Sequence, residues 1–140
     1  NILSEKSINK IIMDYSSNVD RLSKKLKISK EVTNALQRFQ KKGEVYILSG
    51  GKVNEITMIC QNSKSLEYIN GIICTQSGKA KFLKGLKILG KVVFFGDSEI
   101  DYKASINSDT DFVRITGYSN LIIENFKGEN LTSISEYNFL

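Results

Sequence analysis

Two carboxylates stand four residues apart in the string Gly96-Asp97-Ser98-Glu99-Ile100-Asp101, directly after the apolar run Val92–Phe95. Asp97 comes at the tip of a predicted strand, and Asp101 comes one turn into the next predicted helix, on the same side. Two close carboxylates repel each other unless a cation lies nearby. Oxygen ligands of this kind suit Mg²⁺, which keeps several waters and bridges to phosphate oxygens. The alternative is a plain helix N-terminus, capped by Asp97 or Ser98 and favoured by the helix dipole.

A second polar turn, Ser49-Gly50-Gly51, follows the apolar run Val45–Leu48. In parallel sheets, ligands bind at the carboxyl ends of the strands. The two turns are therefore the places where chemistry is expected.

The segments that must position these turns alternate between short strand-length runs and longer segments with helical spacing of apolar residues. Short segments of four mostly apolar residues predict strands at Val45–Leu48, Gly71–Cys74, Val92–Phe95 and Phe112–Ile115. Longer segments predict helices over Lys30–Lys42, with Ser29 as N-cap, over Val53–Cys60, over Gly78–Leu89, and after Ser98. Short strands alternating with helices of about ten residues or more are typical of an α/β protein with a parallel sheet covered by helices.

Composition removes several classes of chemistry. The chain has 140 residues, 41% of them hydrophobic and 25% charged, which fits one globular domain. It has no histidine, which excludes Ser-His-Asp and Cys-His catalysis, and its two cysteines make neither a disulfide framework nor a zinc site. The net charge of +5 comes with no nucleic-acid-binding motif. No membrane-length apolar run or signal peptide is present, and the expected location is the cytoplasm.

Several segments together resemble motifs of the haloacid dehalogenase (HAD) superfamily, in the right order from about Ser29 to Ile115. The similar segments are Val92–Ala104 (fourth motif: a strand, Gly-Asp-Ser-x-x-Asp and a helix opening with Tyr-x-Ala), Val45–Gly51 (second motif), Tyr68–Ile73 (approach to the third strand), Lys79 (third-motif lysine) and Asp111–Ile115 (the following strand). The phosphoglycolate-phosphatase-like group is the most similar. The implied fold is a Rossmann-like parallel sheet with flanking helices.

The resemblance implies a role for each residue of the site. Ser49 would hydrogen-bond a phosphoryl oxygen, helped by the backbone N–H of Gly50. Lys79 would neutralise phosphate charge and steady the nucleophile, with Lys81 and Lys84 as rival lysines for that role. Asp97 would ligate Mg²⁺, and Asp101 would support the metal or bind it through water. Such a set suits phosphoryl transfer, in which catalysis is mostly positioning and cationic stabilisation.

The first motif of the family, an apolar strand ending in Asp-x-Asp that carries the nucleophile, has no clear match. The only Asp-x-Asp, Asp109-Thr110-Asp111, lies after the fourth motif. One hypothesis takes Ile11–Ser16 as a degenerate first strand, with Asp14 as nucleophile and Ser16 in place of the acid/base. The favoured one takes the spacing of apolar residues from Ile8 to Leu22 as a cap helix.

The favoured hypothesis divides the chain into a helical cap remnant, 1–28, and a HAD-like core, 29–140, that is incomplete at its N-terminus. A preceding segment or another chain would then complete the sheet. The predicted function is a Mg²⁺-dependent phosphatase of small phosphomonoesters, or the C-terminal portion of one. Its partner would be a small phosphorylated metabolite, with neither nucleic acid nor membrane. The alternatives are a non-catalytic HAD-like binding or assembly domain and an unrelated basic α/β binding module.

Overall fold

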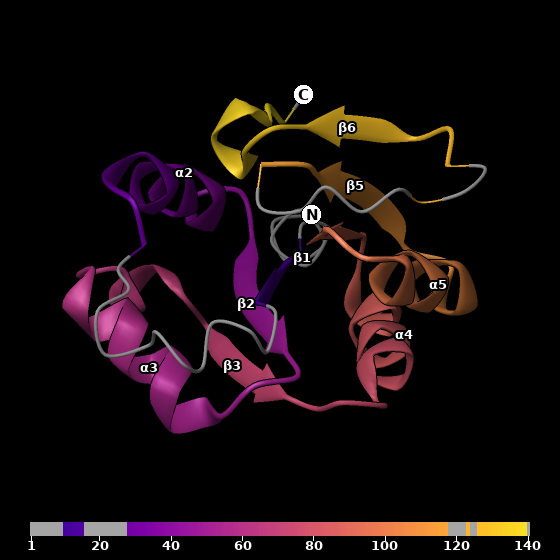
Figure 1. Ribbon diagram of the computed structural model, residues 1–140, viewed down its shortest axis with the longest axis horizontal. Coiled ribbons are helices and arrows are strands. Elements are labelled where there is room, and N and C mark those ends of the chain that lie inside the picture. The colour runs from indigo at the N-terminus through magenta and orange to yellow at the C-terminus, as the bar shows by residue number, and fades with distance from the viewer. Residues whose placement is uncertain (1–9, 16–27, 118–122, 124–125, 140) are drawn as a thin grey trace.

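The computed structural model describes residues 10–15, 28–117, 123 and 126–139, with residues 10–15 described by their backbone alone. Figure 1 shows its elements arranged around one parallel sheet with the strand order β3-β2-β1-β4-β5-β6. The strands are β1 (Lys10–Tyr15), β2 (Glu44–Ser49), β3 (Gly71–Cys74), β4 (Val92–Gly96), β5 (Asp111–Ile115) and β6 (Glu129–Leu131). The helices are α2 (Lys30–Gln40), α3 (Val53–Asn62), α4 (Lys79–Leu89) and α5 (Glu99–Ser108), with short 3₁₀ turns η2 (Leu66–Tyr68) and η3 (Ile134–Glu136).

Helices cover both faces of the sheet. Alternate residues of each strand point to opposite sides, so each strand contributes side chains to both layers of the core. Val45 and Ile47 pack with Val93 and Phe95 in the core beneath α2 and α3. Their neighbours Leu48 and Phe94 pack on the other face against Leu83 and Leu86 of α4 and Ala104 of α5. Figure 1 shows the two pairs of helices on opposite sides of the strands. The continuous apolar runs of β2 and β4 are what a strand buried on both faces requires.

The helix and strand predictions from β2 to β5 are confirmed, including the start of α2. The Ser29 hydroxyl accepts a hydrogen bond from the Val32 N–H at 3.2 Å, which caps the helix. The apolar stripe of α2 is buried, with Leu36 and Phe39 fully enclosed. None of the described helices is both long and apolar enough to pass through a membrane.

The helix predicted over Ile8–Leu22 is wrong for residues 10–15, which form β1 in the centre of the sheet. Ile11 pairs in register with Val45 of β2 on one side and with Val93 of β4 on the other. A run as short as Ile11–Met13 suits either a helix face or a buried strand, and here pairing with two buried strands decides between them. The remaining residues of that predicted helix, 1–9 and 16–27 in the cap segment, lie outside the described residues.

The position of β1 removes the gap that was expected between β2 and β4. It also creates a switch point in the topology. From β1 the chain runs to β2 and β3 on one side, then crosses back to β4 and continues outward to β5 and β6. In open parallel sheets, the crevice at such a reversal is where ligands bind, beyond the carboxyl ends of the strands.

Candidate active site

The carboxylate half of the site is built at the junction of β4 and α5. β4 ends at Gly96, Asp97 follows, and Ser98 caps α5 by accepting the N–H of Asp101 at 3.2 Å. The cap places Asp101 in the first turn of the helix, where its carboxylate is fully buried. Ser98 therefore performs the capping role that the alternative interpretation offered, and Asp101 is left for an interaction with a second element.

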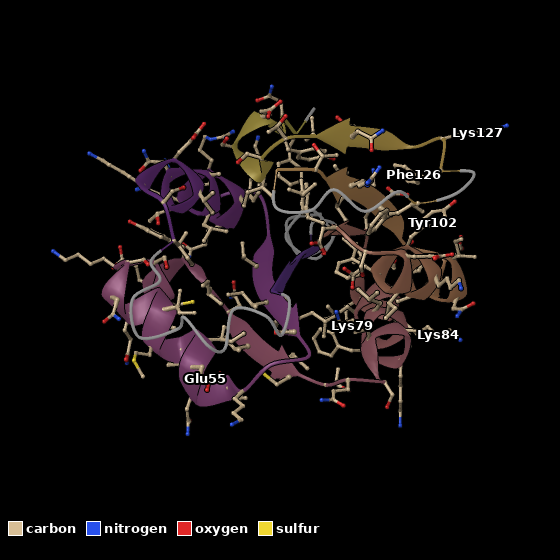
Figure 2. All side chains as sticks on the ribbon, viewed as in Figure 1. Glu55, Lys79, Lys84, Tyr102, Phe126 and Lys127 are labelled. Carbon is tan, nitrogen blue, oxygen red and sulfur yellow. The ribbon has the colours of Figure 1, made fainter. Side chains whose placement is uncertain are left out.

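That interaction is a buried ion pair with Lys79, the first residue of α4. The Lys79 ammonium donates to Asp101 Oδ1 at 2.8 Å, and the exposed fractions of the two side chains are 11% and 0%. Figure 2 shows Lys79 on the side of α4 that faces the strands and Lys84 on the outer side. Lys81 and Lys84 are exposed, so Lys79 is the lysine that the fold brings to the acidic pair.

The second oxygen of Asp101, Oδ2, is buried and has no hydrogen-bond partner among the described residues. It lies against the end of β4, since a Cβ built on Gly96 would come within 2.8 Å of Asp101 Oδ2 and of Asp101 Cβ. Glycine is required at position 96 by this close approach. A buried carboxylate oxygen without a partner is costly, and it marks a place where a ligand can bind.

Asp97 is partly buried beside this carboxylate. Burial raises its pKa, the charge of Asp101 raises it further, and the positive charges of Lys79 and Arg114 only partly offset this. Arg114 comes from β5, where its Cα is the register partner of Gly96. Arg114 was not among the site residues predicted from the sequence. Its position in a predicted strand next to the strand that ends at Gly96 was the available signal.

The hydroxyl half of the site lies at the tip of β2. Ser49 is the last residue of that strand and is fully buried, and its Oγ accepts the Gly51 N–H at 3.0 Å. Its carbonyl accepts the Thr75 N–H at 2.7 Å, which ties the tip of β2 to the loop after β3. Ser49-Gly50-Gly51 is thus a defined turn at the same edge of the sheet as Asp97.

Between the two halves stands the carboxyl end of β1. Asp14 is in register with Leu48, and Tyr15 is in register with Ser49, while Met13 is in register with Phe95 on the other side. The backbone of Asp14 therefore lies near the tip of the central strand, flanked by the ends of β2 and β4. This is the position that a first-motif strand would take. Ser16 lies outside the described residues.

The donor set fits a hard cation in part. Asp97 and Asp101 offer carboxylate oxygens, the pKa of Asp97 is raised by burial and by its acidic neighbour, and one buried oxygen of Asp101 has no partner among the described residues. Within the described residues, no cluster of three or more acidic, cysteine or histidine side chains could hold a metal ion. A Mg²⁺ site here would need a further ligand beyond these two side chains.

The arrangement of strands and helices is the same fold as in three solved structures, one of which is described as a haloacid dehalogenase-like family protein. A protein from Thermotoga maritima assigned as a beta-phosphoglucomutase is 13% identical, with a TM-score of 0.62, over 92% of this chain and 96% of that chain. A haloacid dehalogenase-like hydrolase from Streptococcus pneumoniae is 11% identical, with a TM-score of 0.60, over 79% of this chain and 85% of that chain. The core domain of a protein from S. pneumoniae TIGR4 assigned as a phosphoglycolate phosphatase is 15% identical, with a TM-score of 0.57, over 88% of this chain and 86% of that chain. No family model and no curated protein matches the sequence.

Proposed function

We propose that this protein is a Mg²⁺-dependent hydrolase of small phosphomonoesters, acting at the tips of β1, β2 and β4. The observation that carries the proposal is the buried Lys79–Asp101 ion pair, whose second carboxylate oxygen faces no protein partner among the described residues. Burying a charged pair stabilises a fold little or not at all compared with apolar packing. A buried ion pair beside a carboxyl whose pKa is raised, as that of Asp97 is, at a ligand-binding edge of a sheet is typical of functional sites.

In the proposed reaction, an Asp14 carboxylate oxygen bonds to phosphorus while the ester P–O bond breaks, and the leaving group departs as an alkoxide that takes a proton from solvent. Water then attacks phosphorus, loses a proton to solvent and breaks the bond between phosphorus and the Asp14 oxygen, which releases inorganic phosphate and restores the Asp14 carboxylate. Ser49 and the Gly50 N–H donate to the phosphoryl oxygens, and Lys79 places a positive charge near them. Asp97 and Asp101 would hold Mg²⁺, which neutralises phosphate charge when bound.

The sequence has Ser16, and no second acid, two residues after Asp14. The departing alkoxide of an alkyl ester would then lack a carboxylic acid to protonate it at that position. We therefore expect higher rates with p-nitrophenyl phosphate, whose leaving group departs readily as an anion.

The test is p-nitrophenyl phosphate hydrolysis with Mg²⁺ and with EDTA, on the wild type and on Asp14→Asn. Activity is expected with Mg²⁺, loss of at least about 100-fold in EDTA, and a similar loss in Asp14→Asn, because a nucleophile contributes several orders of magnitude to rate. Asp109→Asn is the matched control, since Asp109 is exposed at the end of α5 and pairs with Lys87. It should retain wild-type activity.

A wild type that is folded and inactive with Mg²⁺ would contradict the proposal. If such a protein still bound inorganic phosphate, the non-catalytic binding domain would be the better description. Full activity in Asp14→Asn would show that hydrolysis does not use the central strand.

A further inference from the structure

The described connections at the strand tips next to the hydroxyl half of the site are short. Residues 50–52 join β2 to α3, and residues 75–78 join β3 to α4. The leaving group of a bound phosphomonoester would therefore meet the loops that surround the strand tips.

Among the described loops, Thr75–Gly78 is fixed directly to the hydroxyl half of the site. The Thr75 N–H donates to the Ser49 carbonyl at 2.7 Å, and the Gly78 N–H donates to Thr75 Oγ1 at 2.9 Å. A Cβ on Gly78 would come within 2.7 Å of that same Oγ1, so the turn needs glycine. A loop held at both ends in this way presents its outer side chains in a defined place.

Gln76 is the side chain of this loop that reaches the phosphate turn. Its Cγ lies 4.0 Å from the position that a Cβ would take on Gly50, the glycine whose N–H is proposed to donate to phosphate. Gln76 is exposed, and its amide offers both donors and an acceptor. Its neighbour Ser77 is also exposed and adds a hydroxyl. The loop carries no charged side chain, so it is suited to a neutral polar leaving group.

We propose that Gln76 is a specificity-determining residue that hydrogen-bonds a hydroxyl of the leaving group, so that the natural substrates are phosphate esters of polyhydroxylated alcohols such as sugars. This inference rests on the proposed phosphatase function. An amide hydrogen bond to a neutral hydroxyl is worth about 1 kcal/mol, which corresponds to a roughly fivefold to tenfold effect on kcat/KM.

The experiment measures kcat/KM of the wild type and of Gln76→Ala for two esters, glucose 6-phosphate and p-nitrophenyl phosphate. We expect kcat/KM to fall about fivefold to tenfold for glucose 6-phosphate in Gln76→Ala. It should change by less than about twofold for p-nitrophenyl phosphate, whose leaving group offers no sugar hydroxyl for Gln76 to bind. Gln61→Ala, at an exposed glutamine near the far end of α3, is the control and should change neither value.

The two measurements separate the two proposals. An active wild type in which Gln76→Ala affects both esters equally, or neither, would overturn the role of Gln76 and leave the phosphatase function standing. A wild type that hydrolyses neither ester would overturn the proposed function, and the specificity role with it.

Discussion

The two halves of the candidate site are built in opposite ways. At the tip of β4, a glycine admits a fully buried carboxylate, and that carboxylate pairs with a buried lysine from another helix. At the tips of β2 and β3, the groups are neutral, and the loop side chain Gln76 is exposed. A Cβ on Gly50 would meet its nearest neighbours only at 4.0 Å. The first half is tightly packed, whereas the second is open at Gly50 and Gln76, although Ser49 beside them is fully buried.

Because of this difference, we expect substitutions in the two halves to have different effects on the stability of the fold and on ligand binding. The charged half is part of the packing between α4, α5 and β4, so a change there alters the fold together with any metal or phosphate site. The neutral half has open space at Gly50, so a substitution at that residue should alter binding while the fold is kept. Substitutions in the two halves can therefore test the comparison directly.

The largest effect is expected from Lys79→Met. It leaves the buried Asp101 carboxylate without its positive partner, and breaking a buried pair in this way costs about 3–5 kcal/mol of unfolding free energy. Urea unfolding followed by circular dichroism measures the loss. Lys84→Met, at an exposed position of the same helix, is the control and should change stability by less than about 0.5 kcal/mol.

If the cost arises from the unpaired carboxylate, the double variant Lys79→Met with Asp101→Asn should recover part of it. Equal destabilisation by Lys79→Met and Lys84→Met would show that the ion pair is not a feature of the folded protein.

A pair of glycine substitutions sharpens the comparison at smaller magnitude. Gly96→Ala forces the new methyl against Asp101 at 2.8 Å and should cost about 1–3 kcal/mol of unfolding free energy. Gly50→Ala meets nothing closer than 4.0 Å and should change stability by less than about 0.5 kcal/mol. Yet it should weaken binding of inorganic phosphate, measured by calorimetry, because the methyl blocks close approach to the backbone N–H. Unchanged phosphate affinity in Gly50→Ala would remove Gly50 from the proposed site.

The sequence alone predicted the charged half better than the neutral half. Gly96, Asp97 and Asp101 form one local string, and the apolar run before them identifies a buried strand without any tertiary information. The ion pair joins Asp101 to Lys79 in another helix, and three lysines near one another made that partner ambiguous until burial distinguished them. The position of Gln76 beside Gly50 depends on the loop conformation, which no residue pattern specifies.

The first strand was the less favoured of two hypotheses for a related reason. Ile11–Met13 has the composition of either element, and its identity depends on the unpaired edges of β2 and β4, which come much later in the chain. The C-terminal segment was also not predicted in detail. There Tyr137 and Phe139 pack edge to face on Phe39, a contact between residues almost a hundred positions apart. Both cases are decided by tertiary pairing and not by local pattern.

The smallest effect on stability, and the one with an unusual sign, is expected from Asp97→Asn. Burial and the charge of Asp101 raise the pKa of Asp97 in the folded protein above its value in the unfolded chain. The folded state therefore binds the proton more tightly, and this contribution to stability is present at low pH and is lost as pH rises through the raised pKa. Asp97→Asn has no carboxyl at this position whose contribution to stability falls as pH rises. Without metal at pH 7, it should therefore unfold at the same temperature as the wild type or slightly higher.

Mg²⁺ should reverse the order of the unfolding temperatures, so that the wild type unfolds at a higher temperature than Asp97→Asn. At a concentration of 100 times its Kd, a bound metal adds about 2.7 kcal/mol to the stability of the wild type, and the variant, which lacks a proposed ligand, should gain much less. Thermal unfolding at pH 7 and at pH 3, with Mg²⁺ and with EDTA, measures both effects. The metal-free difference should vanish at pH 3, where the Asp97 carboxyl is protonated in both states. An equal Mg²⁺-dependent rise in wild type and variant would show that Asp97 is not a metal ligand, and the charged half would then be structural only.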